Sequence, residues 1–288
     1  MSKKNLAYRI ISFIILIILA ILFIFPLYWI ITGMFKPMTA INSPTPQWFP
    51  KEWTLRNLKE LFSRRSAPLF ANVPIKVPGA VRWMINTVFM AVMAMILTCI
   101  TAAMAGYALA KKRFFGRAIL FSLIVAAMAL PKQVILVPLV REISALGLYD
   151  NIWAVIFPTV GWPFGVFLMK QFSEGIPGEM LEAARIDGAS ELRTFTSVVT
   201  PLIKPGIGAL AIFTFINSWN DYFMQLIMLT SSSKLTISLG IATMQAENST
   251  DFGLIMAGAA LAAVPIIIVF LLFQKYFTKG ITMGAVKG

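Results

Sequence analysis

The chain has 288 residues, of which 58% are apolar and 13% are charged, and its mean hydropathy is +0.80. Soluble domains average about 45–50% apolar and about 25% charged residues, so the lipid bilayer is the expected solvent. One cysteine and no histidine exclude a disulfide framework and a thiolate metal cluster and disfavour an enzyme. The net charge of +13 lies in short clusters between apolar stretches, which is typical of topology signals rather than of nucleic-acid binding.

Six stretches are apolar enough, and long enough, to cross a bilayer core that needs about 20 helical residues. This pattern predicts an all-α, polytopic membrane protein with one transmembrane domain over residues 1–288. The expected spans cover about residues 10–35, 84–110, 118–140, 151–169, 206–229 and 252–276. An external loop (36–83), a polar loop between spans four and five (174–205) and a tail (277–288) complete the expected organisation.

The first span follows Lys3, Lys4 and Arg9 and is too long for a signal-peptide core, so we expect it to be retained. An even number of spans places both termini on one side. The basic cluster at residues 111–117 shares that side, which should be the cytoplasm by the positive-inside rule. The external loop is also basic and argues against this orientation.

Within the external loop, Leu55, Leu58, Leu61 and Phe62 recur at helical spacing after Thr54. This spacing predicts a short amphipathic helix on the outer surface. Ordinary loop packing would explain the same residues.

The polar loop predicts two short helices. Pro177 suits a helix start, Gly188 ends the first helix by accepting a positive φ, and Ser190 can cap the second. The small side chains of Ala183 and Ala184 leave the first helix open to close approach, which suits a protein groove. An amphipathic loop lying on the membrane is the alternative.

Two charged side chains lie inside expected spans, Lys132 in the third and Asp221 in the fifth. Intramembrane charges are costly and mark a pathway, unless they lie near an interface and pair locally. A polar translocation cavity would use Gln133, Asn217, Trp219, Asn220 and Asp221. A rival hypothesis is an ion-coupled secondary carrier in which Asp221 and Lys132 move with a proton or ion.

The spacing of Glu182-Ala183-Ala184, Gly188 and Val198-Val199-Thr200-Pro201 resembles the EAA loop of bacterial ABC importer permeases. The family pattern ends in Ile-x-Leu-Pro, and this chain has Val198 and Thr200 at the Ile and Leu positions. These departures affect the turn at residues 198–201 that closes the loop. Further similarity lies in LPKQVILVPL, LMKQF, NSWNDY and the terminal KGITMGAVKG. Together these segments are similar to carbohydrate importer permeases of the maltose type, and the ending resembles the MalG-like member of the permease pair.

The resemblance implies a type I importer permease fold with a cytoplasmic coupling helix that docks on an ATPase subunit. It implies a multi-pass subunit of the bacterial cytoplasmic membrane with both termini inside. The implied partners are a second permease, two ATPase copies and an extracytoplasmic sugar-binding protein, in contact with membrane lipid. No phosphate-binding loop Gly-x4-Gly-Lys-Ser/Thr is present, so this chain is expected to bind no cofactor or metal, with ATP and Mg on the ATPase.

The implied site residues form two groups. The docking surface comprises Glu179, Glu182, Ala183, Ala184, Arg185, Asp187, Gly188 and Ala189. A contact of the tail with the ATPase would use Thr282, Gly284 and Lys287. The chain is thus expected to be a non-catalytic subunit of an ATP-driven sugar importer, with an oligosaccharide as the expected cargo.

Overall fold

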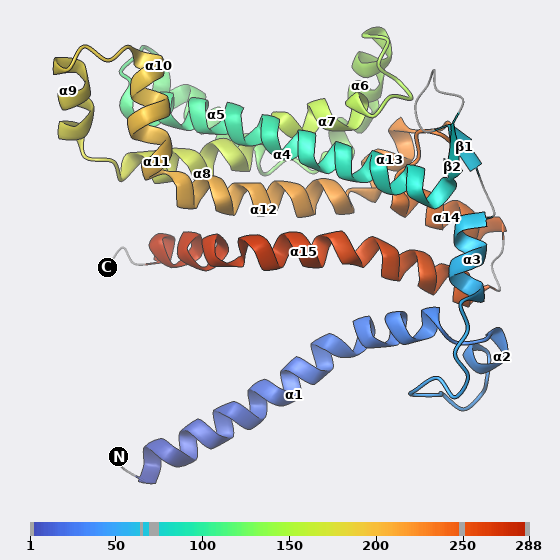
Figure 1. Ribbon diagram of the computed structural model, residues 1–288. Coiled ribbons are helices and arrows are strands. Elements are labelled where there is room, and N and C mark those ends of the chain that lie inside the picture. Colours follow the sequence, from blue (N-terminus) through green and yellow to red (C-terminus); the bar gives the residue numbers. More distant parts are fainter. Residues whose placement is uncertain (1–2, 64–65, 69–74, 248–250, 286–288) are drawn as a thin grey trace. The chain divides into compact units, whose positions relative to one another are not determined.

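The computed structural model describes residues 3–63, 66–68, 75–247 and 251–285 (Figure 1). Within these ranges, four helices are long and apolar enough to cross a membrane, or six segments if each of two bent helix pairs counts as one span. The expected all-α, polytopic class is confirmed. The backbone contacts divide the chain into two units, Met1–Arg82 with Gly240–Val264 and Trp83–Leu239 with Pro265–Gly288.

The first unit contains the N-terminal helix and most of the loop that the sequence predicts to be external. Its elements are α1 (Lys3–Met34), α2 (Met38–Ile41), α3 (Arg56–Ser63) and an antiparallel hairpin of β1 (Ser66–Pro68) and β2 (Lys76–Pro78). Helix α3 confirms the amphipathic helix expected after Thr54. The Asn57 side chain donates hydrogen bonds of 2.9 Å to the carbonyls of Met34 and Lys36, which fixes α3 to the end of α1.

The second unit contains most of the helical bundle. Its first elements are α4 (Gly79–Lys111), α5 (Arg117–Ala127), α6 (Lys132–Ala145), α7 (Trp153–Val160) and α8 (Pro163–Glu174). Next come α9 (Gly178–Ile186), α10 (Glu191–Thr194), a π-helix (Phe195–Val199), α11 (Thr200–Leu202), α12 (Lys204–Asn220) and α13 (Tyr222–Met228). The helices α14 (Ile237–Glu247) and α15 (Phe252–Ala285) belong partly to each unit.

In this second unit, α4, α8 and α12 run alongside one another (Figure 1). Helices α9 and α10 lie at one end of these three, and α6, α7 and α13 lie at the other end. A Cβ atom at Gly106 of α4 would come within 2.6 Å of the α8 backbone at Lys170. Glycine therefore permits the close approach of α4 to α8.

Several expected spans are interrupted. The third is split into α5 and α6, whose axes differ by 104°, because the helix stops before Pro131. The fourth breaks between α7 and α8 at Gly161 and Trp162, and continues to Glu174. The fifth breaks at Asp221, between α12 and α13. The sixth continues as α15 to Ala285, through most of the expected tail.

Asp150 joins two loops of the second unit. It has a φ of +54°, which is rare for a residue other than glycine. Its carboxylate accepts hydrogen bonds from the backbone N–H groups of Thr230 (2.8 Å) and Ser231 (2.9 Å) and pairs with Lys234 at 3.2 Å. Burial raises the pKa of Asp150, but the bonds from Ser231, Thr230 and Lys234 outweigh it and hold the pKa well below the usual value.

Candidate functional site

The polar loop folds as the two expected helices, α9 and α10. Gly188 adopts a φ of +73° after α9, and the Ala189 N–H bonds to the carbonyl of Ala184 at 2.9 Å. Ser190 caps α10 by accepting a hydrogen bond from the Arg193 N–H at 3.3 Å. The helix break and the cap predicted from the sequence are therefore confirmed.

Two lysines at the end of α4 hold this segment. Lys111 donates hydrogen bonds to the carbonyls of Glu174 (3.1 Å) and Ile176 (2.6 Å), just before α9. Lys112 forms an ion pair with Glu191 at the start of α10. The bond from Lys112 lowers the pKa of Glu191; burial alone would lower the pKa of Lys112, but Glu191 and Tyr107 raise it. The coupling segment, defined here as residues 174–205, is thus tied to the end of α4 just before α9 and at the start of α10.

Apolar packing completes this attachment. Ile176, Val199 and Ile203 are buried in one cluster with residues of α4, α8 and α12. The rings of Tyr107 in α4 and Phe195 lie 5.7 Å apart. Movement of the coupling segment must therefore move these three helices or break a packed core.

The closing turn contains the π-helix. The Thr200 hydroxyl donates a hydrogen bond to the Phe195 carbonyl at 2.9 Å, five residues earlier. Pro201 has no N–H to offer to the preceding turn. The departure at Thr200 from the EAA-type ending therefore has a local structural role, and the helix ends at Leu202, one residue after Pro201.

The expected docking residues are largely on the surface. Glu179, Glu182, Ala183, Arg185, Asp187 and Gly188 are exposed, and Ala189 is half-buried. Ala184 is buried, so its small side chain serves packing within the chain and does not leave an open surface, contrary to the sequence interpretation. The sequence analysis also missed Ile186, whose 87% exposure gives α9 an apolar contact point. In the tail, α15 runs through Thr282 and Gly284, and Lys287 lies outside the described residues.

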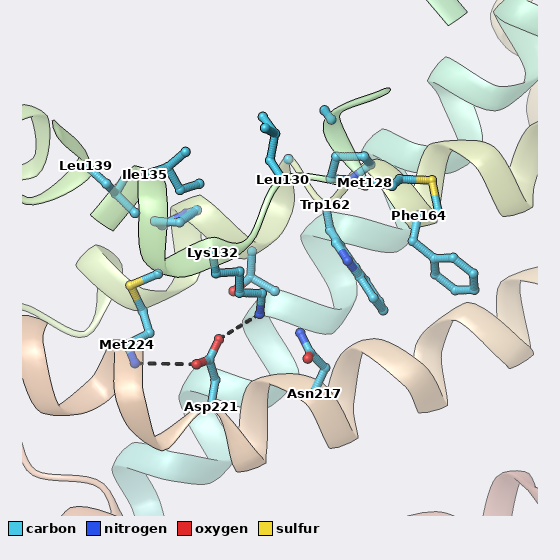
Figure 2. Close-up of a pocket in the computed structure, with 15 residues that line it drawn as sticks. Met128, Leu130, Lys132, Ile135, Leu139, Trp162, Phe164, Asn217, Asp221 and Met224 are labelled. Carbon is cyan, nitrogen blue, oxygen red and sulfur yellow. Dashed lines mark hydrogen bonds and ion pairs between the residues drawn. The ribbon is translucent and has the colours of Figure 1, made fainter. Parts of the chain in front are cut away.

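A second group of residues surrounds a cavity at the opposite end of the second unit. The cavity has a volume of about 440 Å³ and lies where the third, fourth and fifth expected spans are broken (Figure 2). Such a volume falls within the usual range for small-molecule sites of about 300–1,000 Å³. Broken helices at membrane depth are tolerated where they line a cavity or are buried in protein.

Lys132 and Asp221 point toward each other inside this cavity (Figure 2). Their ammonium and carboxylate groups lie 3.0 Å apart. The Lys132 side chain is 49% exposed and that of Asp221 is 16% exposed. Asp221 also caps α13 by accepting a hydrogen bond from the Met224 N–H at 3.4 Å. The ion pair therefore connects the start of α6 to the break between α12 and α13.

A second cavity of about 580 Å³ shares four lining residues with the first. These are Lys132, Trp162, Asn217 and Asp221. The remaining walls differ, with α12 and Phe270 lining the second cavity.

The structure places the expected pathway residues in different surroundings. Asn217 and Asp221 line both cavities, and Asn220 lines the second. Trp219 is only 1% exposed and packs on Phe215, so the expectation that its ring faces a cargo is wrong. Gln133 is exposed and lines neither cavity.

Trp162 lines both cavities and was not among the expected pathway residues. The available signal was its place between Gly161 and Pro163, a helix-breaking pair inside an apolar span.

The fold and these sites define a polytopic helical membrane protein with an anchored polar loop at one end of a bundle and polar cavities at the other. The model of the family "Binding-protein-dependent transport system inner membrane component" matches residues 99–283. The chain belongs to this family.

Curated relatives extend the similarity over the whole chain. The arabinooligosaccharides transport system permease protein AraQ of Bacillus subtilis is 32% identical over 292 residues, covering 100% of this chain and 99% of the relative. AraQ of Halalkalibacterium halodurans is 33% identical over 272 residues, covering 94% and 93%. The maltodextrin transport system permease protein MdxG of Bacillus subtilis is 32% identical over 293 residues, covering 100% and 99%.

A solved structure shows the same fold. A chain of a bacterial ABC transporter involved in the import of the acidic polysaccharide alginate matches with a TM-score of 0.77 and 23% identity. The match covers 96% of this chain and 99% of that chain.

Proposed function

We propose that this chain is a non-catalytic, membrane-spanning subunit of an ATP-driven importer of oligosaccharides. The observation that carries the proposal is the coupling segment, whose α9 is exposed while Lys111 and Lys112 hold the residues just before α9 and the start of α10. Membership of a binding-protein-dependent transport family supports it, as do relatives named for arabinooligosaccharide and maltodextrin transport.

In this proposal, a cytoplasmic ATPase subunit binds α9 through the expected docking residues and Ile186. ATP and Mg bind to the two ATPase copies, and their closure pulls on the coupling segment. Because Ile176, Val199 and Ile203 are packed into the bundle, the pull reaches α4, α8 and α12 as a whole. The helices then change between inward-facing and outward-facing arrangements, with a second permease forming the other half of the passage.

The orientation follows from the same proposal. Both termini and the coupling segment face the cytoplasm, and the external loop faces the binding protein. Helix α12 has 17 residues and rises about 26 Å at about 1.5 Å per residue, so Asp221 lies toward the outer side of the membrane. The two cavities at Asp221 then form part of the sugar pathway, in which Asn217, Lys132 and Asp221 offer donors and acceptors to hydroxyl groups.

The ion-coupled carrier is not favoured. The family and the named relatives are components of binding-protein-dependent systems. Lys132 and Asp221 also pair with each other, which satisfies both charges without a transported ion.

The test is purification of the tagged chain from its own cells in mild detergent, followed by identification of co-purifying proteins. The recovered complex is reconstituted and its ATP hydrolysis measured with binding protein, with and without arabino- and malto-oligosaccharides. We expect a co-purified ATPase and sugar-stimulated hydrolysis. A well-folded chain that takes up sugar alone, and loses uptake when an ion gradient collapses, would overturn the proposal.

A matched pair of variants tests the docking surface. Ile186→Ser removes the exposed apolar side chain of α9, and we expect less ATPase to co-purify. Leu192→Ser alters a side chain of similar size and 68% exposure on α10, outside the expected docking residues, and should leave co-purification unchanged.

A further inference from the structure

The two cavities meet at one set of side chains. Lys132, Trp162, Asn217 and Asp221 line both, whereas every other lining residue belongs to one cavity alone. We call these four residues the partition. The two cavities therefore adjoin at these four side chains.

Within the partition, the Lys132–Asp221 ion pair connects two chain segments that each adjoin a helix break. Lys132 is the first residue of α6, immediately after the 104° bend at the end of α5. Asp221 lies where α12 ends and α13 begins. A shift of α6 or of the end of α12 by a few ångströms would separate the ammonium group of Lys132 from the carboxylate of Asp221, which now lie 3.0 Å apart.

Helix stability alone does not explain a lysine at this position. The N-terminus of a helix carries a partial positive charge and favours acidic side chains, so Lys132 is unfavourable at the start of α6. Asp221 compensates for the unfavourable charge of Lys132 only while the start of α6 stays beside the end of α12. The pairing therefore makes the position of α6 depend on that of α12.

We propose that the Lys132–Asp221 ion pair is a latch that closes the partition in the resting transporter and opens during each transport cycle. This inference rests on the proposed function. Nearly half of the Lys132 side chain is exposed, and exposed ion pairs contribute little free energy, so the latch biases the resting state yet opens reversibly. Once the charges separate, sugar hydroxyls can accept from the ammonium group and donate to the carboxylate, because a hydroxyl does both.

Loss of the latch should populate the opened state without cargo. An exposed ion pair of typical strength shifts such an equilibrium by about two- to fivefold. We therefore expect sugar-free ATP hydrolysis by the reconstituted complex to rise about two- to fivefold in Lys132→Gln and in Asp221→Asn. Asn can still cap α13, so the second variant removes the charge and keeps the cap.

The double variant Lys132→Gln/Asp221→Asn should hydrolyse ATP no faster than either single variant, because only one interaction is lost. Lys132→Arg keeps the charge and should raise sugar-free hydrolysis less than Lys132→Gln does. The control is Arg56→Gln, which removes an ion pair with Glu60 within α3 and should leave sugar-free hydrolysis unchanged.

Unchanged sugar-free hydrolysis in both single variants would overturn the latch. A double variant whose fold increase in hydrolysis equals the product of the two single-variant increases would also overturn it. If the wild-type complex hydrolyses no ATP in response to sugar and binding protein, the proposed function fails instead.

A second measurement follows the separation of the two positions directly, without relying on the hydrolysis rate. The double variant Lys132→Cys/Asp221→Cys is made in a Cys99→Ala background, so that its only cysteines are the two introduced ones. The complex is treated with a short bis-maleimide in two states: without nucleotide, and after trapping with ATP and vanadate. Cross-linking should be faster in the nucleotide-free complex and should stop transport. Equal rates in the two states would contradict the latch.

Discussion

Gly188, between α9 and α10, offers the sharpest test of the coupling segment. Its φ of +73° lies in the left-handed region, and a Cβ atom placed there would meet nothing within 4 Å. Substitution by alanine therefore causes no clash, and its whole effect comes from backbone conformation. We expect Gly188→Ala to weaken the docking of the ATPase, because α9 can no longer hold its angle to α10 without strain.

The size of the effect follows from the backbone. A left-handed conformation costs an L-residue about 1–2 kcal/mol. This free energy corresponds to a factor of about 5–30 in the population of the docking conformation. Affinity of the detergent-purified permease for its ATPase, measured by titration, should fall by a similar factor. Asn tolerates the left-handed region, so Gly188→Asn should lose less affinity than Gly188→Ala.

Gly178 supplies the matched control. A Cβ atom at Gly178 would also meet nothing within 4 Å, and its φ is not positive. Gly178→Ala, at the start of α9, should therefore bind the ATPase as the wild type does. Equal affinities for wild type and Gly188→Ala, or an equal loss in Gly178→Ala, would refute the reasoning.

Three further predictions concern other parts of the chain. Asp150→Ala should lower the free energy of unfolding by about 2–3 kcal/mol and Asp150→Asn by less, measured by thermal unfolding in detergent. Folding lowers the pKa of Asp150, so the ionised carboxylate stabilises the fold above the unfolded pKa of about 3.9, and this stabilisation is lost as the pH falls through the folded pKa. A free energy of unfolding of the wild type that rises on acidification in this range would contradict the role of Asp150. Lys111→Met should reduce the sugar transported per ATP while the ATPase still co-purifies, and an unchanged ratio would show that its bonds are dispensable. Deletion of residues 282–288 should lower sugar-stimulated hydrolysis without dissociating the complex, and unchanged transport would refute a role for the tail.

Hydropathy located the apolar segments but not their breaks. The window at 118–140 is apolar on average despite Lys132, so nothing in its average shows that α6 leaves α5 at 104°. Pro131 was a visible signal, yet proline also occurs inside continuous helices, as Pro265 does in α15. Local composition cannot separate these outcomes, because they depend on which neighbours satisfy the freed backbone groups.

The error at Trp219 had a different origin. Asn217 and Asp221 are four residues apart and lie on one face of α12, whereas Trp219, two residues from each, lies on the other. Helical geometry therefore favoured the burial of Trp219 once Asn217 and Asp221 faced a cavity. The depth and partners of Lys132 could not be predicted in this way, because Asp221 is 89 residues further along the chain.

Helix α12 connects the two sites. It begins at Lys204, immediately after the packed end of the coupling segment, and ends beside Asp221. A Cβ atom at Gly206 would lie 2.5 Å from the Phe172 ring of α8, so glycine lets the start of α12 pack closely on α8. Its only proline, Pro205, lies in the first turn, where no helix hydrogen bond is lost. A rotation imposed near Lys204 is thus carried by one unbroken helix to the ion pair, and this makes the proposed docking and the proposed latch two ends of one movement.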